Sequence, residues 1–390
     1  MKIALLGTRG VPANYGGFET CAEEVSRGLA NRGHAVTVYC RRGNAPGDPT
    51  TYGNVQLRYV RHIDHKILGT LSHTLSATCD ALCRDFDVLL YFNAANALPA
   101  LLGRLAGRPI VLNVDGLEWK RRKWGVMGRS YYQLAEWLST RVATRILSDA
   151  MAIQAYYERR WRTPSTFIPY GAHIAESEHP TVLSHYGLEA GGYFLTASRL
   201  EPENNADLTV RAFADVPTEK KLVLVGGANY DSQFVRRLHE TRDSRVMFLG
   251  PIYDAEHIRE LHCGAFAYVH GNEVGGTNPA LLKAMGFGNA ILALDVPFNA
   301  EVVADGALLY RKTPAHLAAQ MCQLLDDPAL VRELRDRARE RARLAYSWER
   351  VIDGYERVLT AAATGAYRSR PPSDGDALPL PAPLAGSSRA

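Results

Sequence analysis

The sequence predicts an α/β protein of two domains, each built from a parallel β-sheet wrapped by helices. Its 390 residues are too many for one ordinary hydrophobic core. Short apolar runs rich in β-branched residues alternate with helical segments almost throughout, which is typical of parallel sheets. The polar, glycine-containing stretch from Tyr170 to Gly192 interrupts this alternation and predicts a linker between the domains.

The first half contains an amphipathic helix from Phe18 to Ala30, closed by Gly33, and these predicted strands: KIALLG, AVTVYC, VQLRYV, DVLLYF, PIVLNV, AMAIQA and STFIP. In the second half the predicted strands are YFLTAS, KLVLVGG, RVMFLG, FAYVHG, AILAL and ALLY. Two long helical segments follow, DPALVRELRDRARERARLA and SWERVIDGYERVL. The Pro-, Ser- and Gly-rich end cannot bury enough apolar surface to order itself. We therefore predict domains at residues 1–172 and 173–345, a final helix at 346–364 and a disordered tail at 365–390.

Composition is that of a soluble globular protein, with 46% hydrophobic and 22% charged residues. The N-terminus MKIALLGTRG predicts a strand, because its apolar stretch ends at Gly7 without a cleavage-site pattern, so we expect a cytoplasmic protein. The six cysteines lack CxxC spacing and suggest neither a zinc site nor a disulfide framework. Cys79 and Cys83, at i and i+4 of a predicted helix, are expected to pack in the core.

The net charge of +4 is unevenly distributed along the chain. Up to Ala175 there are 22 Lys and Arg against 13 Asp and Glu, a net charge of +9, and the remainder carries −5. The excess of cations in the first half indicates an anionic partner there, such as a phosphorylated lipid, a membrane surface or nucleic acid.

The first strand leads into a glycine-bearing loop and a helix, GTRGVPANYGGFETCAEEV. Gly16 and Gly17 allow a ligand to approach the backbone, and the amides of the following helix favour an anion or a sugar. A tight turn that needs glycine for structural reasons is the alternative. An NAD site is disfavoured, because the compact GxGxxG is absent and Cys40-Arg41-Arg42 stands where an acid would bind the ribose.

A second glycine turn, NEVGGTNPALLKAMGFGN, follows the strand FAYVHG in the second half. Asn278 is a good N-cap and Pro279 a good first helical residue, so we expect a helix to begin there. The preceding GGTN would then form an amide-lined pocket at the positive end of this helix. Glu273 lies at the carboxyl end of a strand, where α/β folds bind ligands.

Four strings, GTRGVPANYGGFET, NVDGLEWKR, SRLEPENN and VGGTNPALLKAM, resemble GT-B glycosyltransferases of family 4, in particular the bacterial rhamnosyltransferases of surface-polysaccharide synthesis. The resemblance covers nearly the whole chain. It implies a GT-B fold, with two Rossmann-like domains facing a cleft, and a retaining hexosyltransferase that needs no metal. The nucleotide-sugar donor would bind mainly to residues 173–345 and the acceptor mainly to residues 1–172, and the helix at 346–364 would cross back to the first domain.

Among the donor-binding positions implied by the resemblance, one carries the usual arginine and two depart from the family pattern. Arg199 matches the diphosphate-binding arginine, although an inter-domain salt bridge is an alternative. A lysine is usual five residues later, where this chain has Asn204. A ribose-binding glutamate is usual where this chain has Lys283. We hypothesise that Lys283 replaces the charge missing at Asn204, with a solvated lysine or a structural ion pair as alternatives. The remaining donor-binding candidates are Gly275, Gly276, Thr277 and Asn278.

Glu273 and Asp115 are the catalytic candidates. Glu273 matches the family's first glutamate only if the VGGTN loop is two residues longer than usual, because the position eight before Lys283 is Gly275. Its implied role is to contact the donor sugar and stabilise an oxocarbenium-like transition state. Asp115 follows the strand PIVLNV and would contact the acceptor hydroxyl or the sugar, with Glu118 as the second candidate. A loop-capping role is the alternative for all three.

Basic and aromatic residues alternate in the segment WKRRKWGVMGRSYYQLAEW, from Trp119 to Trp137. This combination is typical of a protein that lies on an anionic leaflet, and a lipid-diphosphate-linked acceptor would also explain it. We therefore expect a possible membrane-binding surface at Trp119–Arg129, on the inner face of the membrane, and no nucleic-acid partner. A plain solvated surface is the alternative.

Sugar transfer to a growing surface glycan, with rhamnose favoured, is the leading functional hypothesis. The alternatives are a GT-B-fold nucleotide-sugar 2-epimerase, which would need no acceptor, and a degenerate protein that binds sugar nucleotides without turnover. Acceptor dependence separates the first two, and any turnover excludes the third.

Overall fold

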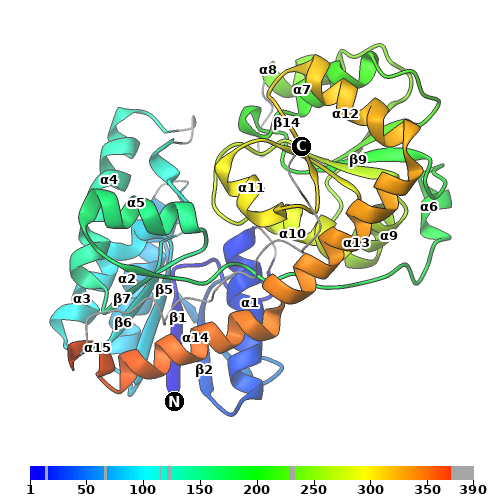
Figure 1. Ribbon diagram of the computed structural model, residues 1–390. Coiled ribbons are helices and arrows are strands. Elements are labelled where there is room, and N and C mark those ends of the chain that lie inside the picture. The colour runs from blue at the N-terminus through cyan, green and yellow to red at the C-terminus, as the bar shows by residue number, and fades with distance from the viewer. Residues whose placement is uncertain (14–15, 66–67, 115, 121–123, 228–232, 370–390) are drawn as a thin grey trace. The chain divides into compact units, whose positions relative to one another are not determined.

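The computed structural model describes residues 1–13, 16–65, 68–114, 116–120, 124–227 and 233–369. The chain divides into two compact units (Figure 1). The first holds Met1–Gly171 and the segment that begins at Trp348, and the second holds Ala172–Ser347. Each unit contains one sheet in which neighbouring strands are almost all parallel, so the predicted α/β class is confirmed.

The first sheet has the order β3-β4-β2-β1-β5-β6-β7-β8, and only the short edge pair β3 and β4 is antiparallel. Its strands are β1 (Lys2–Leu6), β2 (Ala35–Arg41), β3 (Thr51–Tyr52), β4 (Val55–Val60), β5 (Val88–Phe92), β6 (Ile110–Asn113), β7 (Arg145–Ser148) and β8 (Ser165–Phe167). β1, β5 and β6 are almost wholly buried, which explains why they read as nearly continuous apolar runs.

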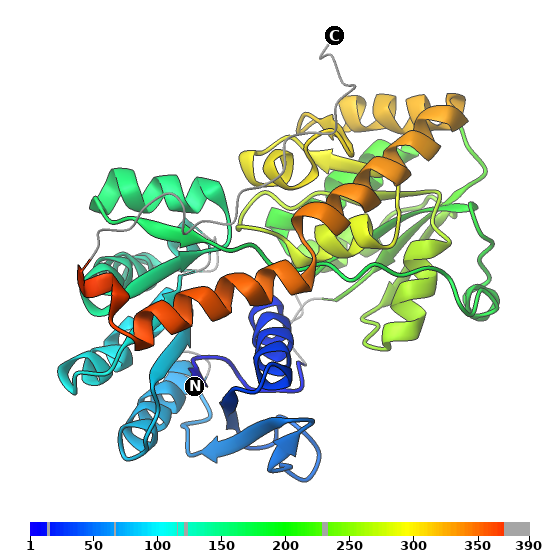
Figure 2. The same ribbon diagram turned by 60° about the horizontal axis from the view of Figure 1, so that its bottom comes forward.

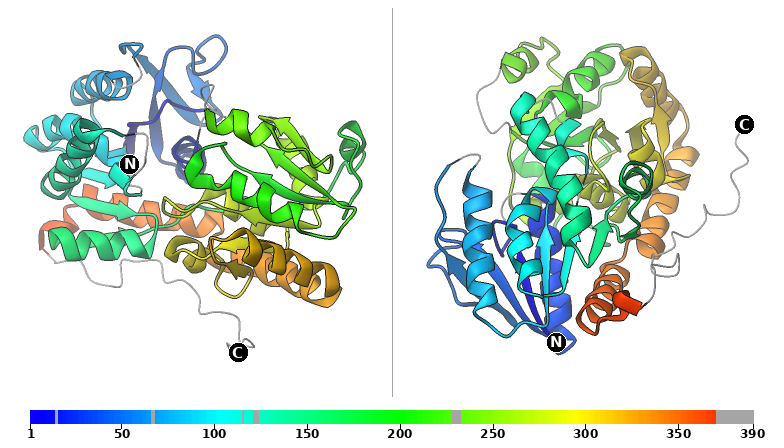
Figure 3. Two further views of the ribbon diagram at one scale, coloured as in Figure 1. Left: turned by 90° about the horizontal axis from the view of Figure 1, so that it is seen from above. Right: turned by 90° about the vertical axis from the view of Figure 1, so that its left-hand side faces the viewer.

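Helices cover both faces of the first sheet (Figure 3). The helices of this unit are α1 (Gly17–Asn31), α2 (Leu68–Leu82), η1 (Ala94–Asn96), α3 (Ala97–Leu105), η2 (Glu118–Lys120), α4 (Val126–Val142), α5 (Met151–Trp161), α14 (Trp348–Ala363) and α15 (Ala366–Ser369). α2, α3 and α4 pack side by side, and α1 packs against α14.

The second sheet has the order β11-β10-β9-β12-β13-β14 and is parallel throughout. Its strands are β9 (Tyr193–Ala197), β10 (Lys221–Val225), β11 (Val246–Gly250), β12 (Ala267–His270), β13 (Ile291–Leu294) and β14 (Leu308–Tyr310). The helices of this unit are α6 (Val182–His185), η3 (Pro202–Asn204), α7 (Ala206–Ala214), α8 (Gln233–His239), α9 (Ala255–Cys263), α10 (Pro279–Gly286), α11 (Pro297–Val303), α12 (Pro314–Asp326) and α13 (Pro328–Ala345). All of the strands predicted in the second half are confirmed.

Two local predictions are wrong, and one strand is missing from the prediction. AMAIQA is not a strand but the start of α5, whose buried Ile153 and Tyr157 repeat at helical spacing. The strand in this part of the chain is β7, which precedes α5. Its sequence RILS is fully buried and too short to show the alternation of a strand. Cys79, on the outer side of α2, and Cys83, which follows the end of that helix, are exposed rather than packed in the core.

The end of the described chain returns to the first unit as α14, which crosses and packs against α1 (Figure 2). Arg32, at the end of α1, forms ion pairs with Asp353 and Glu356 of α14, both at 2.6 Å. Tyr355 is fully buried, and its hydroxyl accepts a hydrogen bond of 2.7 Å from the Asn113 amide at the end of β6. The predicted disordered tail begins with the short helix α15, and residues 370–390 lie outside the described residues.

Candidate active site

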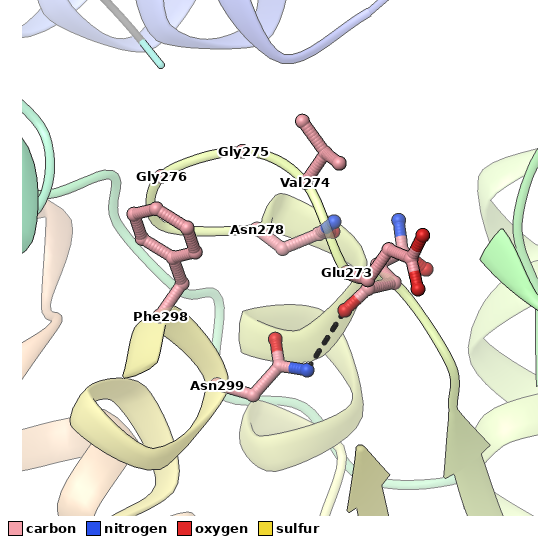
Figure 4. Close-up of a pocket in the computed structure, with 8 residues that line it drawn as sticks. Glu273, Val274, Gly275, Gly276, Asn278, Phe298 and Asn299 are labelled. Carbon is pink, nitrogen blue, oxygen red and sulfur yellow. Dashed lines mark hydrogen bonds between the residues drawn. The ribbon is translucent and has the colours of Figure 1, made fainter. Parts of the chain in front are cut away.

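The turn between β12 and α10 forms a small pocket at the carboxyl end of the second sheet (Figure 4). The residues that line the pocket are Asn272, Glu273, Val274, Gly275, Gly276, Asn278, Phe298 and Asn299. Gly275 has φ of +149°, a conformation that favours glycine. The helix begins as predicted, with Pro279 in its first turn and the Asn278 side chain accepting a hydrogen bond of 2.9 Å from the Ala280 amide.

Glu273 is held in this turn by neighbours from other segments. Its Oε2 accepts a hydrogen bond of 3.3 Å from the Asn205 amide and forms an ion pair with Lys312. Its backbone N–H donates to the Glu203 carbonyl oxygen at 3.1 Å. The Glu273 side chain remains 19% exposed, so these contacts fix the carboxylate while leaving it open to a ligand.

The loop after β9 packs against the same turn. Asn205 has φ of +54° and donates from Nδ2 to the Gly271 carbonyl oxygen at 2.8 Å. A Cβ atom on Gly271 would lie 2.5 Å from the Asn204 carbonyl oxygen, so only glycine permits this approach. Asn204 itself is buried and donates to the Arg199 carbonyl oxygen at 2.8 Å. Asn204 therefore holds the loop, whereas the Arg199 side chain is exposed at the end of β9, the strand beside β12.

Lys283 lies in the second turn of α10, and its side chain is exposed, while Leu281, Leu282 and Met285 are buried. Protein packed around the ammonium lowers the pKa of Lys283 by desolvation, although water still reaches the side chain. Among the described residues no carboxylate forms an ion pair with it. Thr277 is buried, and Gly276 lines the pocket.

The site residues that the sequence interpretation missed include Lys312, Phe298 and Asn299, which lie outside the turn. The Asn299 amide donates to the carbonyl oxygens of Asn272 and Leu294, both at 2.9 Å, and so supports the turn from α11. The Phe298 ring lies beside the glycines of the turn (Figure 4). A signal was present for Lys312, because it closely follows the strand ALLY and so lies at the carboxyl end of the sheet.

In the first unit, carboxylates of α1 hold the glycine loop. The Glu19 carboxylate accepts a hydrogen bond of 3.3 Å from the Arg9 amide, and Glu23 accepts one of 2.7 Å from the Ala13 amide. Burial raises the pKa of Glu19. Gly16 is the extended N-cap of α1, and Gly17 is its first residue. A Cβ atom on Gly16 would meet its first neighbour at 3.5 Å, so packing alone does not require glycine there.

The predicted Asp115 lies outside the described residues. Glu118 lies in η2 and accepts a hydrogen bond of 3.4 Å from the Trp124 indole. Asp149 was missed by the sequence interpretation, although it directly follows β7 and is fully buried. In the part of the chain that is described, no three His, Cys, Asp or Glu side chains cluster so as to hold a metal ion.

Glu136 is a buried carboxyl group on α4, the helix that packs against η2. It accepts a hydrogen bond of 2.9 Å from the Tyr156 hydroxyl of α5. Burial raises the pKa of Glu136 to about 7. Neighbouring groups act in the opposite direction and lower this pKa: Tyr156, Arg160, Trp119 and Lys120. This group therefore changes its charge near neutral pH.

The segment predicted as a membrane-binding surface, Trp119–Arg129, contains both half-buried and exposed side chains. Trp124 packs on Tyr132 with ring centroids 5.1 Å apart, and the Tyr131 hydroxyl donates to the Ala95 carbonyl oxygen. Residues 121–123 lie outside the described residues. Val126 and Met127 of this segment belong to an apolar face on the neighbouring helices α3 and α4, defined by the exposed Leu98, Leu102, Leu105, Val126, Met127, Leu134 and Trp137. Arg104, Arg129 and Arg141 are exposed on the same helices, and no exposed carboxylate lies on either.

Residues 188–345 match the family model described as glycosyl transferases group 1. The match covers this segment and not the rest of the chain, and we call the segment the group 1 domain. The group 1 domain contains the pocket, Arg199, Lys283 and Lys312, and its family is one of sugar-transferring enzymes. A second model, a domain of unknown function (DUF1972), matches residues 96–173, which include η2 and α4.

One relative of known activity aligns with the chain over 214 residues. It is the O-antigen chain mannosyltransferase B of Escherichia coli, which is 26% identical over 53% of this chain and 52% of its own length. The chain thus spans about half the length of this relative. None of the helices in the described ranges is long and apolar enough to cross a membrane.

Several solved structures share the architecture of the chain beyond the group 1 domain. The sucrose-phosphate synthase of Thermosynechococcus elongatus has a TM-score of 0.80 at 18% identity, covering 93% of this chain and 99% of its own. HepE of Anabaena in complex with UDP-glucose has a TM-score of 0.75 at 18% identity, covering 93% and 100%. WaaG, a glycosyltransferase involved in lipopolysaccharide biosynthesis, has a TM-score of 0.69 at 16% identity, covering 92% and 100%. The predicted GT-B fold is therefore confirmed.

Proposed function

We propose that this protein is a retaining, metal-independent glycosyltransferase that moves rhamnose from a nucleotide sugar to a cell-surface or lipid-linked glycan. The observation that carries the proposal is Glu273, whose partly exposed carboxylate is fixed in the glycine turn of the group 1 domain. The choice of rhamnose is supported by the resemblance of the four sequence strings. The mannosyltransferase relative makes mannose the main rival.

The chemistry requires charge stabilisation at two places. The bond between the anomeric carbon and the phosphate oxygen breaks, the acceptor hydroxyl oxygen forms the new bond on the same face, and the leaving phosphate takes the hydroxyl proton. Negative charge grows on the diphosphate, where the amides at the start of α10 and the exposed Arg199 guanidinium supply donors. Positive charge grows on the sugar ring, where the Glu273 carboxylate stabilises it.

We assign acceptor binding to the first unit, around η2 and the buried Asp149. A lipid-linked acceptor fits the apolar face of α3 and α4, because that face combines exposed aliphatic side chains with arginines and lacks exposed carboxylates. The face includes Val126, Met127 and Arg129 of the predicted segment Trp119–Arg129 and extends beyond it along α3 and α4, whereas Trp119 and Trp124 are half-buried.

Donor identity is tested by thermal shift with dTDP-rhamnose, GDP-mannose, UDP-glucose and UDP-N-acetylglucosamine. A ligand that binds only the native state at 100 times its Kd stabilises it by about 2.7 kcal/mol, so the donor is expected to raise Tm by several degrees. We expect dTDP-rhamnose to give the largest rise and to be consumed only when an acceptor is present. The absence of any shift or turnover would contradict the proposal, and conversion without an acceptor would favour the 2-epimerase.

Membrane binding is tested by co-sedimentation with vesicles of phosphatidylcholine alone or with phosphatidylglycerol. We expect binding to the anionic vesicles, and a loss of about tenfold or more in Leu105→Gln/Met127→Gln, because two exposed apolar side chains no longer enter the interface. Tyr253→Gln is the matched control, since Tyr253 is 84% exposed in the second unit. Equal binding of the double variant and the wild type would exclude this face as the membrane contact.

A further inference from the structure

The donor site lacks a cation at position 204, and the structure explains why this position does not face a ligand. The Asn204 side chain is buried, and its amide donates to the Arg199 carbonyl oxygen at 2.8 Å. Its backbone oxygen lies against Gly271, where even a Cβ atom would not fit. A neutral residue that supports the loop has therefore taken the place where the resemblance implies a lysine for the diphosphate.

Lys312 brings a positive charge to the same pocket from the end of β14. Its ammonium forms an ion pair with the Glu273 carboxylate, while 47% of the Lys312 side chain remains exposed. Strands β12, β13 and β14 are neighbours in one sheet and are parallel. Glu273 follows β12 and Lys312 follows β14, so both residues lie at the carboxyl end of the sheet. Lys312 thus lies beside the acid that we propose to face the donor sugar.

We infer that Lys312 is a donor-binding residue that supplies the second positive charge for the sugar diphosphate, in place of residue 204. This inference rests on the proposed function of the site. In the free protein the ammonium holds Glu273 in position. Because a solvent-exposed ion pair contributes little, the ammonium can turn to a phosphate oxygen at small cost when the donor binds. Lysine suits this exchange, since its ammonium is a compact charge on a flexible stem.

Lys283 is the competing residue for this role, and the contacts distinguish the two. Lys312 touches the carboxylate in the pocket, whereas Lys283 forms no ion pair with a carboxylate in the described part of the chain. Protein around Lys283 lowers the pKa of its ammonium by desolvation, whereas the Lys312 ammonium has the Glu273 carboxylate as a direct partner. Both lysines can be replaced singly and compared directly.

The test is calorimetric titration of the full chain with UDP, dTDP and GDP, each compared with its nucleoside. For the diphosphate that wild type binds, Lys312→Ala is expected to weaken binding about tenfold and to leave nucleoside binding within about twofold. Lys312→Arg should restore most of the affinity, because the charge returns. The matched control is Arg311→Ala, which removes the neighbouring exposed cation and should bind as wild type does. Thermal melting of each variant verifies that it is folded.

The outcomes separate this inference from the proposed function. Wild-type affinity of Lys312→Ala for the diphosphate would overturn the inference and leave the proposed function standing. Weakening by Lys283→Ala alone would assign the role to Lys283 instead. An equal loss of nucleoside and diphosphate affinity in Lys312→Ala would make Lys312 a structural partner of Glu273, which also overturns the inference. No binding of any nucleoside diphosphate by wild type would refute both proposals together.

Discussion

Replacing Glu273 by Gln is expected to lower the turnover of sugar transfer by about 10²- to 10³-fold, because the transition state loses a charge aimed at the sugar. The side chain keeps its size, and a carbonyl oxygen remains to accept the hydrogen bond from Asn205. We therefore expect the donor KM to change much less than kcat. Initial rates at saturating acceptor, measured over a range of donor concentrations, separate the two effects.

The matched control for this variant is Glu219→Gln. Glu219 is exposed in the segment before β10, at the amino end of the strands of the same sheet. The Glu219→Gln variant should transfer sugar at the wild-type rate. A turnover of Glu273→Gln within about threefold of wild type would exclude the carboxylate from the transition state. Glu273 would then only cap the turn between β12 and α10.

Replacing Glu136 by Gln is expected to remove a pH-dependent loss of stability. The pKa of this buried carboxyl group is raised from 4.5 to about 7 in the folded protein, so the unfolded chain releases the proton first as pH rises. The folded state therefore loses stability as pH rises from about 4.5 to about 7, and the loss is complete above that range. Relative to wild type, Glu136→Gln should gain about 2 to 3 kcal/mol between pH 5 and pH 8.

Urea denaturation of both proteins at several pH values measures this difference. Taking the difference between the two proteins removes the contribution of the buried histidines, such as His262 and His270, because their lowered pKa affects both equally. Glu158→Gln, at an exposed position of α5, should follow the wild type at every pH. Parallel curves for wild type and Glu136→Gln would show that folding does not disfavour the charge of Glu136.

Much of the fold could be predicted from the sequence, because long apolar runs and glycine stops mark most strands and helices. The failure at AMAIQA and RILS has a physical cause. A buried strand of four residues carries no period, and the apolar start of α5 resembles a strand until its buried Ile153 and Tyr157 are seen at helical spacing. The spacing of aromatic residues in α4 likewise did not reveal which rings pack inward.

The chemistry of the candidate site could be predicted only in part. The turn from Glu273 to Asn278 is local, so its acid, its glycines and its helix cap are all visible in one stretch of sequence. Lys312 and Asn299 join the turn through the order of strands β12, β13 and β14, which no local pattern encodes. The titrations distinguish the alternative roles of Lys283, which the sequence pattern places on the outer side of α10, as observed.

The return of α14 to the first unit affects the order in which the two units fold during synthesis on the ribosome. Tyr355 and Leu359 are wholly buried in the first unit, yet they are synthesised after the entire second unit, Ala172–Ser347. Domains generally fold as units during synthesis, so the second unit can complete its core while the first still exposes the surface that α14 will cover. The unit that begins the chain is therefore the last to close, and we expect release of an incomplete chain to leave that surface open to chaperones.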